Sequence, residues 1–152
     1  MISKKTKYAI KALLYLARNY GKGPILIAHL SEKEKIPKKF LEAILLDLRK
    51  QGILGSKIGV GGGYYLIKKP SEVVLSHVLR SIDGPIALIP CVSLNFYERC
   101  DDCPDETICG IREVMKEVRD ASLKVLSGTT LADVLKRESR LSSRPKKASK
   151  KR

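Results

Sequence analysis

The 152-residue chain is 43% hydrophobic and carries a formal net charge of +14, so it can fill one domain core and attract a polyanion. No apolar run approaches the roughly 18 residues that a membrane-spanning helix needs, and the N-terminus spaces its apolar residues instead of clustering them, which argues against a signal peptide. We therefore expect a cytoplasmic protein that does not contact a membrane.

The positive charge is concentrated at the two ends of the chain. Residues 1–70 carry a net +11, residues 71–140 carry −3, and residues 141–152 carry +6. A basic first half beside a mildly acidic second half predicts a nucleic-acid partner for the first and another partner for the second. On charge alone, an ordinary solvated basic surface remains the alternative.

Three helices are predicted in the first 52 residues. The first ends at Gly21, a short second helix fits residues 25–34, and a third follows Pro37 and ends at Gly52. The apolar face of the first helix comprises Ile10, Leu13, Leu14 and Ala17. The buried stripe of the third helix comprises Phe40, Leu41, Ile44, Leu45 and Leu48.

A β-hairpin is predicted after the third helix. Two β-prone runs, residues 53–58 and 64–67, flank the glycine-rich segment "GVGGG", whose positive-φ freedom suits a hairpin tip. A shorter helix fits residues 73–82. The order predicts a mainly α fold with a small β-hairpin wing, in which residues 1–83 form a winged helix-turn-helix DNA-binding domain.

Candidate DNA-contacting residues lie at three places in this domain. The N-terminal part of a recognition helix meets base edges, so Lys38, Lys39 and Glu42 face the major groove, with Glu42 accepting from cytosine. An intrahelical pair of Glu42 with a lysine is the alternative. Phosphate contacts are expected from the first helix and groove contacts from the wing tip. The residues of the first helix are Lys4, Lys5 and Lys7. The residues of the wing are Lys57, Gly59, Gly61 and Gly62.

The second half is predicted to hold a cysteine-rich loop at 84–109, helices at 110–140 and a disordered basic tail at 141–152. In the long helix a heptad-like apolar seam favours a partner helix, with packing on its own domain as the alternative. The seam comprises Ile111, Val114, Val118, Ala121 and Val125. Thr130 and Asp133 form a capping pattern that opens a short last helix.

All four cysteines, Cys91, Cys100, Cys103 and Cys109, fall within nineteen residues. In a reducing cytosol such clustering favours metal or redox chemistry over structural disulfides. An iron–sulfur cluster, tetrahedral zinc and metal-free thiols that respond to oxidation all stay open on spacing alone. The five acidic residues between the first and last cysteine disfavour thiolate in the metal-free form.

Other chemistries are less well supported. A redox enzyme using Cys100-x-x-Cys103 would need a thioredoxin-like βαβ context, which the pattern lacks, so we do not expect an enzyme. His29 and His77 adjoin apolar helical positions and are interpreted as packed or surface residues, not ligands.

The segments "SKKTKYAIKALLYLA", "FLEAILLDLRKQGIL", "GVGGGYYL" and "TTLADVL" together resemble the Rrf2 family of bacterial transcription regulators. The resemblance covers about residues 1–135. It implies a homodimer with a winged helix-turn-helix in each subunit, a long dimerisation helix crossing between subunits, and binding to a palindromic operator in double-stranded DNA. For many members it also implies an iron–sulfur cluster held by three cysteines before the long helix.

By this resemblance, Cys91, Cys103 and Cys109 fall at the ligand positions for an iron–sulfur cluster of the two-iron or four-iron type. Eleven residues separate Cys91 from Cys103, which is longer than in the best-known members. The carboxylate and histidine that serve as fourth ligands in two branches are replaced here by Lys7 and Arg112. The fourth ligand is then expected to be Cys100 or an exogenous group.

One further departure concerns the wing, where Ile58 stands beside Lys57 in place of the arginine common at its base. Together these observations predict a dimeric, sequence-specific transcription regulator that senses iron–sulfur, redox or nitrosative status, and they leave open whether it represses or activates. A zinc-stabilised adaptor and a metal-free thiol-responsive repressor are the alternatives.

Overall fold

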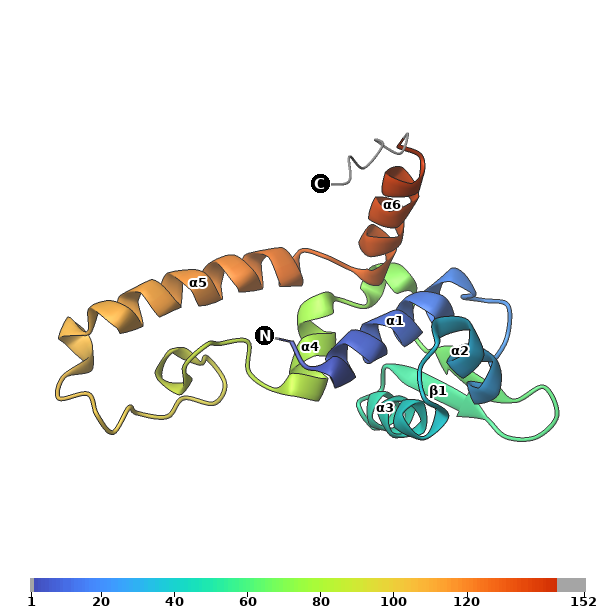
Figure 1. Cartoon of the computed structure of the whole chain (residues 1–152), viewed down its shortest axis with the longest axis horizontal. Helices are drawn as coiled ribbons and strands as arrows, with labels where there is room; N and C mark the ends of the chain where they lie inside the picture. The colour runs from blue at the N-terminus through green and yellow to red at the C-terminus, as the bar shows by residue number, and fades with distance from the viewer. Residues whose placement is uncertain (1, 145–152) are drawn as a thin grey trace, which may run out of the picture.

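The computed structural model describes residues 2–144, so residues 145–152 of the basic tail predicted at 141–152 lie outside the described residues. Figure 1 shows a head and an arm. The head comprises residues 2–83 with helix α6 (Leu131–Ser142), and the arm comprises residues 84–127, a loop followed by helix α5 (Gly110–Ser127). Helix α5 projects away from the head, and α6 returns to pack on α1 (Lys4–Arg18).

Helix α1 forms the centre of the head. Ser3 caps its N-terminus by accepting the backbone N–H of Thr6 at 3.0 Å, which satisfies one of the free donors of the first turn. The helix ends at Arg18, three residues before the predicted stop at Gly21. Ala9, Ala12 and Leu13 are completely buried against the other helices and the hairpin.

Helices α2 (Ile27–Glu34) and α3 (Lys38–Lys50) form the helix-turn-helix. The prediction began α2 at residue 25, but Ile25 is extended and exchanges backbone hydrogen bonds of 2.8 and 2.9 Å with Tyr64 of the hairpin. Gly63 permits this contact, because a Cβ at that position would lie 2.2 Å from the Ile25 carbonyl oxygen.

The stripe predicted for α3 is buried except at one end. Leu41, Ile44, Leu45 and Leu48 have at most 1% exposure. Phe40 was wrongly assigned to the core: its side chain is 39% exposed and packs edge-on against Tyr8, with ring centroids 5.7 Å apart. It lies in the first turn of α3, where the neighbouring Leu41 is the side chain that is fully buried.

The wing is an antiparallel pair of strands, β1 (Leu54–Lys57) and β2 (Gly63–Leu66), with Leu54 opposite Leu66 and Lys57 opposite Gly63. Leu54 and Leu66 close the core from below α1 and α3. Helix α4 (Leu75–Asp83) follows a short 3₁₀ turn, Pro70–Glu72. This arrangement confirms the predicted mainly helical, winged helix-turn-helix fold.

Helix α6 ties the end of the described chain back to the head. The predicted capping pair is present, since Thr130 accepts from the Asp133 N–H and Asp133 accepts from Thr130. Leu131 is fully buried in the core of the head. The helix extends to Ser142, two residues into the segment predicted as a tail. Within residues 2–144, none of the helices combines the length and apolar character that crossing a membrane requires.

Candidate nucleic-acid interface and thiol site

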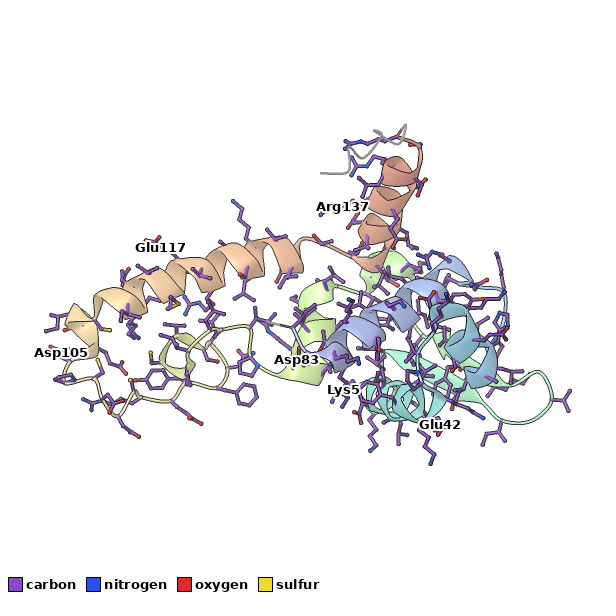
Figure 2. The ribbon with its side chains drawn as sticks, in the orientation of Figure 1. Lys5, Glu42, Asp83, Asp105, Glu117 and Arg137 are labelled. Carbon is purple, nitrogen blue, oxygen red and sulfur yellow. The ribbon has the colours of Figure 1, made fainter. Side chains whose placement is uncertain are left out.

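The leading end of α3 offers charged side chains to solvent. Lys38, Lys39 and Glu42 are exposed, while Leu41 beside them is buried and holds the helix to the head. Figure 2 shows the Glu42 side chain pointing away from the body of the head. Glu42 makes no ion pair with any described residue, so the alternative of a pair with a lysine in its own helix does not hold in this structure.

The three lysines predicted at the start of α1 have different surroundings. Lys7 is exposed, and the Lys4 ammonium lies 5.7 Å from the centroid of the Tyr8 ring. Lys5 donates to Asp47 of α3 at 2.6 Å, and this hydrogen bond holds the pKa of Asp47 below its usual value. Lys5 therefore joins α1 to α3, and its charge is already partly neutralised.

The wing tip is held by backbone geometry. Gly59 and Gly61 have φ values of +97° and +72°, a region that residues with a Cβ rarely adopt. Gly62 is buried, and a Cβ there would lie 2.3 Å from the Lys57 carbonyl oxygen. Lys57 is exposed, so the tip presents a charged side chain at its base, and beyond it glycine backbone with the exposed side chains of Ile58 and Val60.

The four cysteines line one cavity in the arm, as their clustering predicted. Its volume is about 630 Å³, and its wall is formed by the loop and the first turn of α5. Cys91 is buried in the 3₁₀ turn Pro90–Val92, Cys103 and Cys109 are partly buried, and Cys100 is exposed. The Sγ of Cys109 accepts the Arg112 N–H at 3.4 Å and so caps α5.

The thiols interact with one another. Partial burial raises the pKa of the Cys103 thiol, and the adjacent Cys109 and Cys100 thiols raise that pKa further. A raised pKa agrees with the expectation from sequence that thiolate is disfavoured. The rise is caused by burial and by the other thiols, not by the carboxylates of the loop. Because its neighbours disfavour ionisation of the Cys103 thiol, a bound cation would offset this effect.

The cavity wall contains a buried polar group without a partner. Arg112 is 21% exposed, and its Nε lies 3.7 Å from the Glu106 carboxylate, too far for a hydrogen bond. This Nε has no hydrogen-bond partner among the described residues. Glu106 instead accepts from the Tyr97 hydroxyl at 2.6 Å, which raises the pKa of Tyr97. Sequence reasoning missed Tyr97 and Glu106, because a loop has no periodicity that reveals such pairs.

The donor atoms fit an iron–sulfur cluster or zinc in chemical type, because four thiols are available and both centres are held by thiolates. The unpartnered Arg112 Nε is a donor that an acceptor atom of a bound group would satisfy. Among residues 2–144, however, no three His, Cys, Asp or Glu side chains converge closely enough to hold a metal ion. The loop would have to close around a bound group.

Helix α5 has an uncovered apolar stripe. None of its 18 residues is buried, and its main contacts are with α4 and the turn at Pro90–Val92. Ile111, Val114, Val118 and Val125 of the predicted seam are between 38% and 68% exposed. The alternative that this stripe packs on its own domain is therefore not observed among the described residues.

Comparison with known proteins gives a consistent assignment. Residues 2–137 match the sequence profile of the Rrf2 family, described as an iron-dependent transcriptional regulator. An Rrf2-like HTH-type regulator of Rhodobacter capsulatus is 47% identical over 138 residues, covering 89% of this chain and 92% of that protein. The HTH-type regulator IscR of Serratia proteamaculans is 30% identical over 137 residues, covering 88% and 78%.

A similar solved structure has the same fold over nearly its whole length. The cysteine regulator CymR of Bacillus subtilis superposes with a TM-score of 0.75 at 29% identity, covering 90% of this chain and 96% of that one. Both the resemblance and the fold expected from the sequence are thereby confirmed. The chain belongs to the Rrf2 family of helix-turn-helix transcriptional regulators, and it is a regulator and not an enzyme.

Proposed function

We propose that this regulator acts as a homodimer on a palindromic operator and that its four cysteines hold an iron–sulfur cluster that sets operator affinity. The observation that carries the proposal is the position of the thiol cavity. It lies in the arm, in the loop that follows the basic head along the chain and precedes α5, and its wall includes the first turn of α5 with Ile111 of the stripe. A sensor at this position can alter how two DNA-binding heads are placed.

The dimer is supported by the stripe on α5. The helix is 18 residues long and leaves its apolar positions exposed, and an isolated helix of this kind gains stability mainly by burying such a face. A two-fold related copy of α5 offers the matching stripe. Two heads held in this way would reach successive major grooves about 34 Å apart.

The cluster is supported by donor type and by the relatives. Cys91, Cys103 and Cys109 would hold it, and Cys100, which lines the same cavity, is the fourth ligand that the chain itself offers. The matching family is described as iron-dependent. When bound, the cluster would supply a centre that responds to redox state and nitrosation.

The loop is joined mechanically to both neighbours. Cys109 caps the first turn of α5, and Arg119 of α5 donates to the Val92 carbonyl beside Cys91. A change in how these thiols are held therefore shifts the loop against α5. In a dimer such a shift alters head spacing, and a coupling of about 1–3 kcal/mol would change operator occupancy roughly 5–150-fold.

The cluster is tested by anaerobic purification with an absorbance spectrum and assays for iron, sulfide and zinc. We expect a coloured protein with stoichiometric iron and sulfide. Cys103→Ser should remove both, and Cys100→Ser should lower occupancy if Cys100 is the fourth ligand, whereas the control Ser93→Ala should retain both. Colourless protein with zinc, or with no metal, would defeat the cluster and leave the DNA proposal standing.

Operator binding is tested by selecting duplexes from a random DNA library with the full-length protein, in holo and metal-free forms side by side. We expect a near-palindromic consensus with half-sites one turn apart and different affinities for the two forms. A selection that returns no consensus sequence would contradict sequence-specific binding.

A further inference from the structure

The wing tip is an apolar segment within a strongly basic head. Residues 58–67 contain no charged side chain, although residues 1–70 carry a net +11. The side chain of Ile58 is 96% exposed, and that of Val60 is fully exposed. Both are branched aliphatic side chains, and they extend into solvent from the most distant part of the hairpin.

The tip around them is thin, and its backbone is closely packed on itself. The remaining four residues between 58 and 63 are all glycine. Only the side chains of Ile58 and Val60 therefore project beyond the backbone there. The Gly62 N–H donates to the Gly59 carbonyl at 3.0 Å. The close packing of Gly62 on the Lys57 carbonyl leaves no space for a side chain. Ile58 and Val60 are therefore presented on a narrow ribbon.

A narrow, uncharged tip beside basic side chains fits the minor groove of DNA. That groove is only about 6 Å wide, which favours a backbone without side chains. Branched aliphatic groups pack against its sugars and base edges and push apart flexible base steps. The negatively charged backbones on either side match Lys57 at the base of the tip and the positive charge of the head.

We propose that the wing engages the operator through apolar contact, with Ile58 and Val60 packed in the minor groove and Lys57 on the adjacent phosphate. This inference rests on the proposed operator binding and assigns the chemistry of one contact. The apolar part of this contact adds affinity without releasing counterions, whereas Lys57 supplies the salt-dependent part. The wing selects sites by the ease of opening the groove, and pyrimidine–purine steps are the most easily opened.

The test compares variants of the full-length protein on a duplex recovered from the random-library selection, with affinity measured at several salt concentrations. We expect the Ile58→Ser, Val60→Ser double variant to bind about 10- to 100-fold more weakly, from the loss of two buried aliphatic groups. Its slope of log affinity against log salt should equal that of the wild type. The control Lys57→Ala should make the slope shallower by about 0.9.

Two further measurements sharpen the test. Ile58→Arg should steepen the salt slope by about 0.9 and reduce the preference for pyrimidine–purine steps. Because Ile58 and Val60 are fully exposed, the double variant should keep the wild-type melting temperature, which separates a lost contact from a lost fold.

Unchanged affinity of the double variant would overturn the inference, because the two side chains would then make no contact with the duplex. A shallower salt slope for that variant would also overturn it, because the contact would then be electrostatic. Failure to recover any duplex would refute operator binding itself. These results are distinguishable, since the first two require a duplex that the wild-type protein binds.

Discussion

The head and the arm bury their apolar residues to very different degrees. In the head, Leu13, Leu30, Leu41, Leu45 and Leu131 have no exposed surface, whereas α5, the longest helix of the described chain, has no buried residue. The head can thus fold on its own contacts, because its hydrophobic stabilisation is complete within one chain. The arm gains its main stabilisation only when a partner buries the apolar stripe of α5. Its conformation can therefore change with binding more readily than that of the head.

The largest effect is expected in the head, from Leu45→Ala on α3. Leu45 is fully buried, so truncation leaves a cavity and should lower the free energy of unfolding by about 2–5 kcal/mol. The neighbouring Leu46 is 42% exposed, and Leu46→Ala should cost well under about 1 kcal/mol. Urea denaturation of both variants checks this, and equal losses would mean that the burial assigned to α3 is incorrect.

The next effect is expected in the arm, and it concerns assembly instead of folding. Val114 on the α5 stripe is 54% exposed, so Val114→Lys should leave the unfolding of the head unchanged. In a dimer it places a charge at the seam in both copies, which should weaken dimerisation at least about 100-fold. Sedimentation velocity over a range of concentrations measures this.

The control for that variant is Glu113→Lys on the same turn of α5. Glu113 lies off the stripe, and its exposed pair with Lys116 contributes little. We expect the control to stay dimeric. If both variants remain dimeric, the stripe is not the dimer seam.

The sequence predicted the head better than the arm, for physical reasons. Helical periodicity located α3 and its buried leucines, but it does not indicate how far a stripe extends, and Phe40 was therefore misassigned. The start of α2 depends on Ile25 pairing with Tyr64, about forty residues away, and no local pattern encodes such a contact. Long-range hydrogen bonds decide these boundaries.

For the candidate sites, the spacing of the cysteines was enough to predict that they gather. It did not reveal that Arg112 would have a buried Nε without a partner or that Tyr97 would bond to Glu106. The exposed charges at the start of α3 followed from helical phase. The pairing of Lys5 with Asp47 did not, because it depends on how α1 and α3 pack.

A smaller effect is expected where the head reads DNA. Glu42→Ala should remove discrimination at one base pair, worth about 1–3 kcal/mol, because a carboxylate accepts selectively from cytosine. The matched variant Lys39→Ala should weaken binding to all sequences alike and make the salt slope shallower by about 0.9. Competition assays with single-base operator variants separate the two, and uniform weakening by Glu42→Ala would contradict base recognition.

The smallest effect is expected from the Lys5–Asp47 pair. The hydrogen bond from Lys5 lowers the pKa of Asp47 in the folded state, so its stabilisation is complete above the unfolded pKa of about 3.9 and is lost as the pH falls through the folded value. Both side chains are 37% exposed, which limits the contribution to under about 1 kcal/mol. Urea denaturation at pH 6 and pH 3 should show that the stability difference between wild type and Asp47→Asn is smaller at the lower pH.

Other carboxyls whose pKa values are lowered, such as those of Asp83 and Asp133, contribute equally to both proteins and cancel in this difference. A Lys5→Ala, Asp47→Asn double variant should show no additional loss beyond the single variants, because either change alone removes the pair. Parallel loss of stability in wild type and Asp47→Asn between the two pH values would mean that the pair stabilises neither α1 nor α3. In that case Lys5 would be free to contact phosphate, and the DNA affinity of Asp47→Asn would differ from wild type only through the change in net charge.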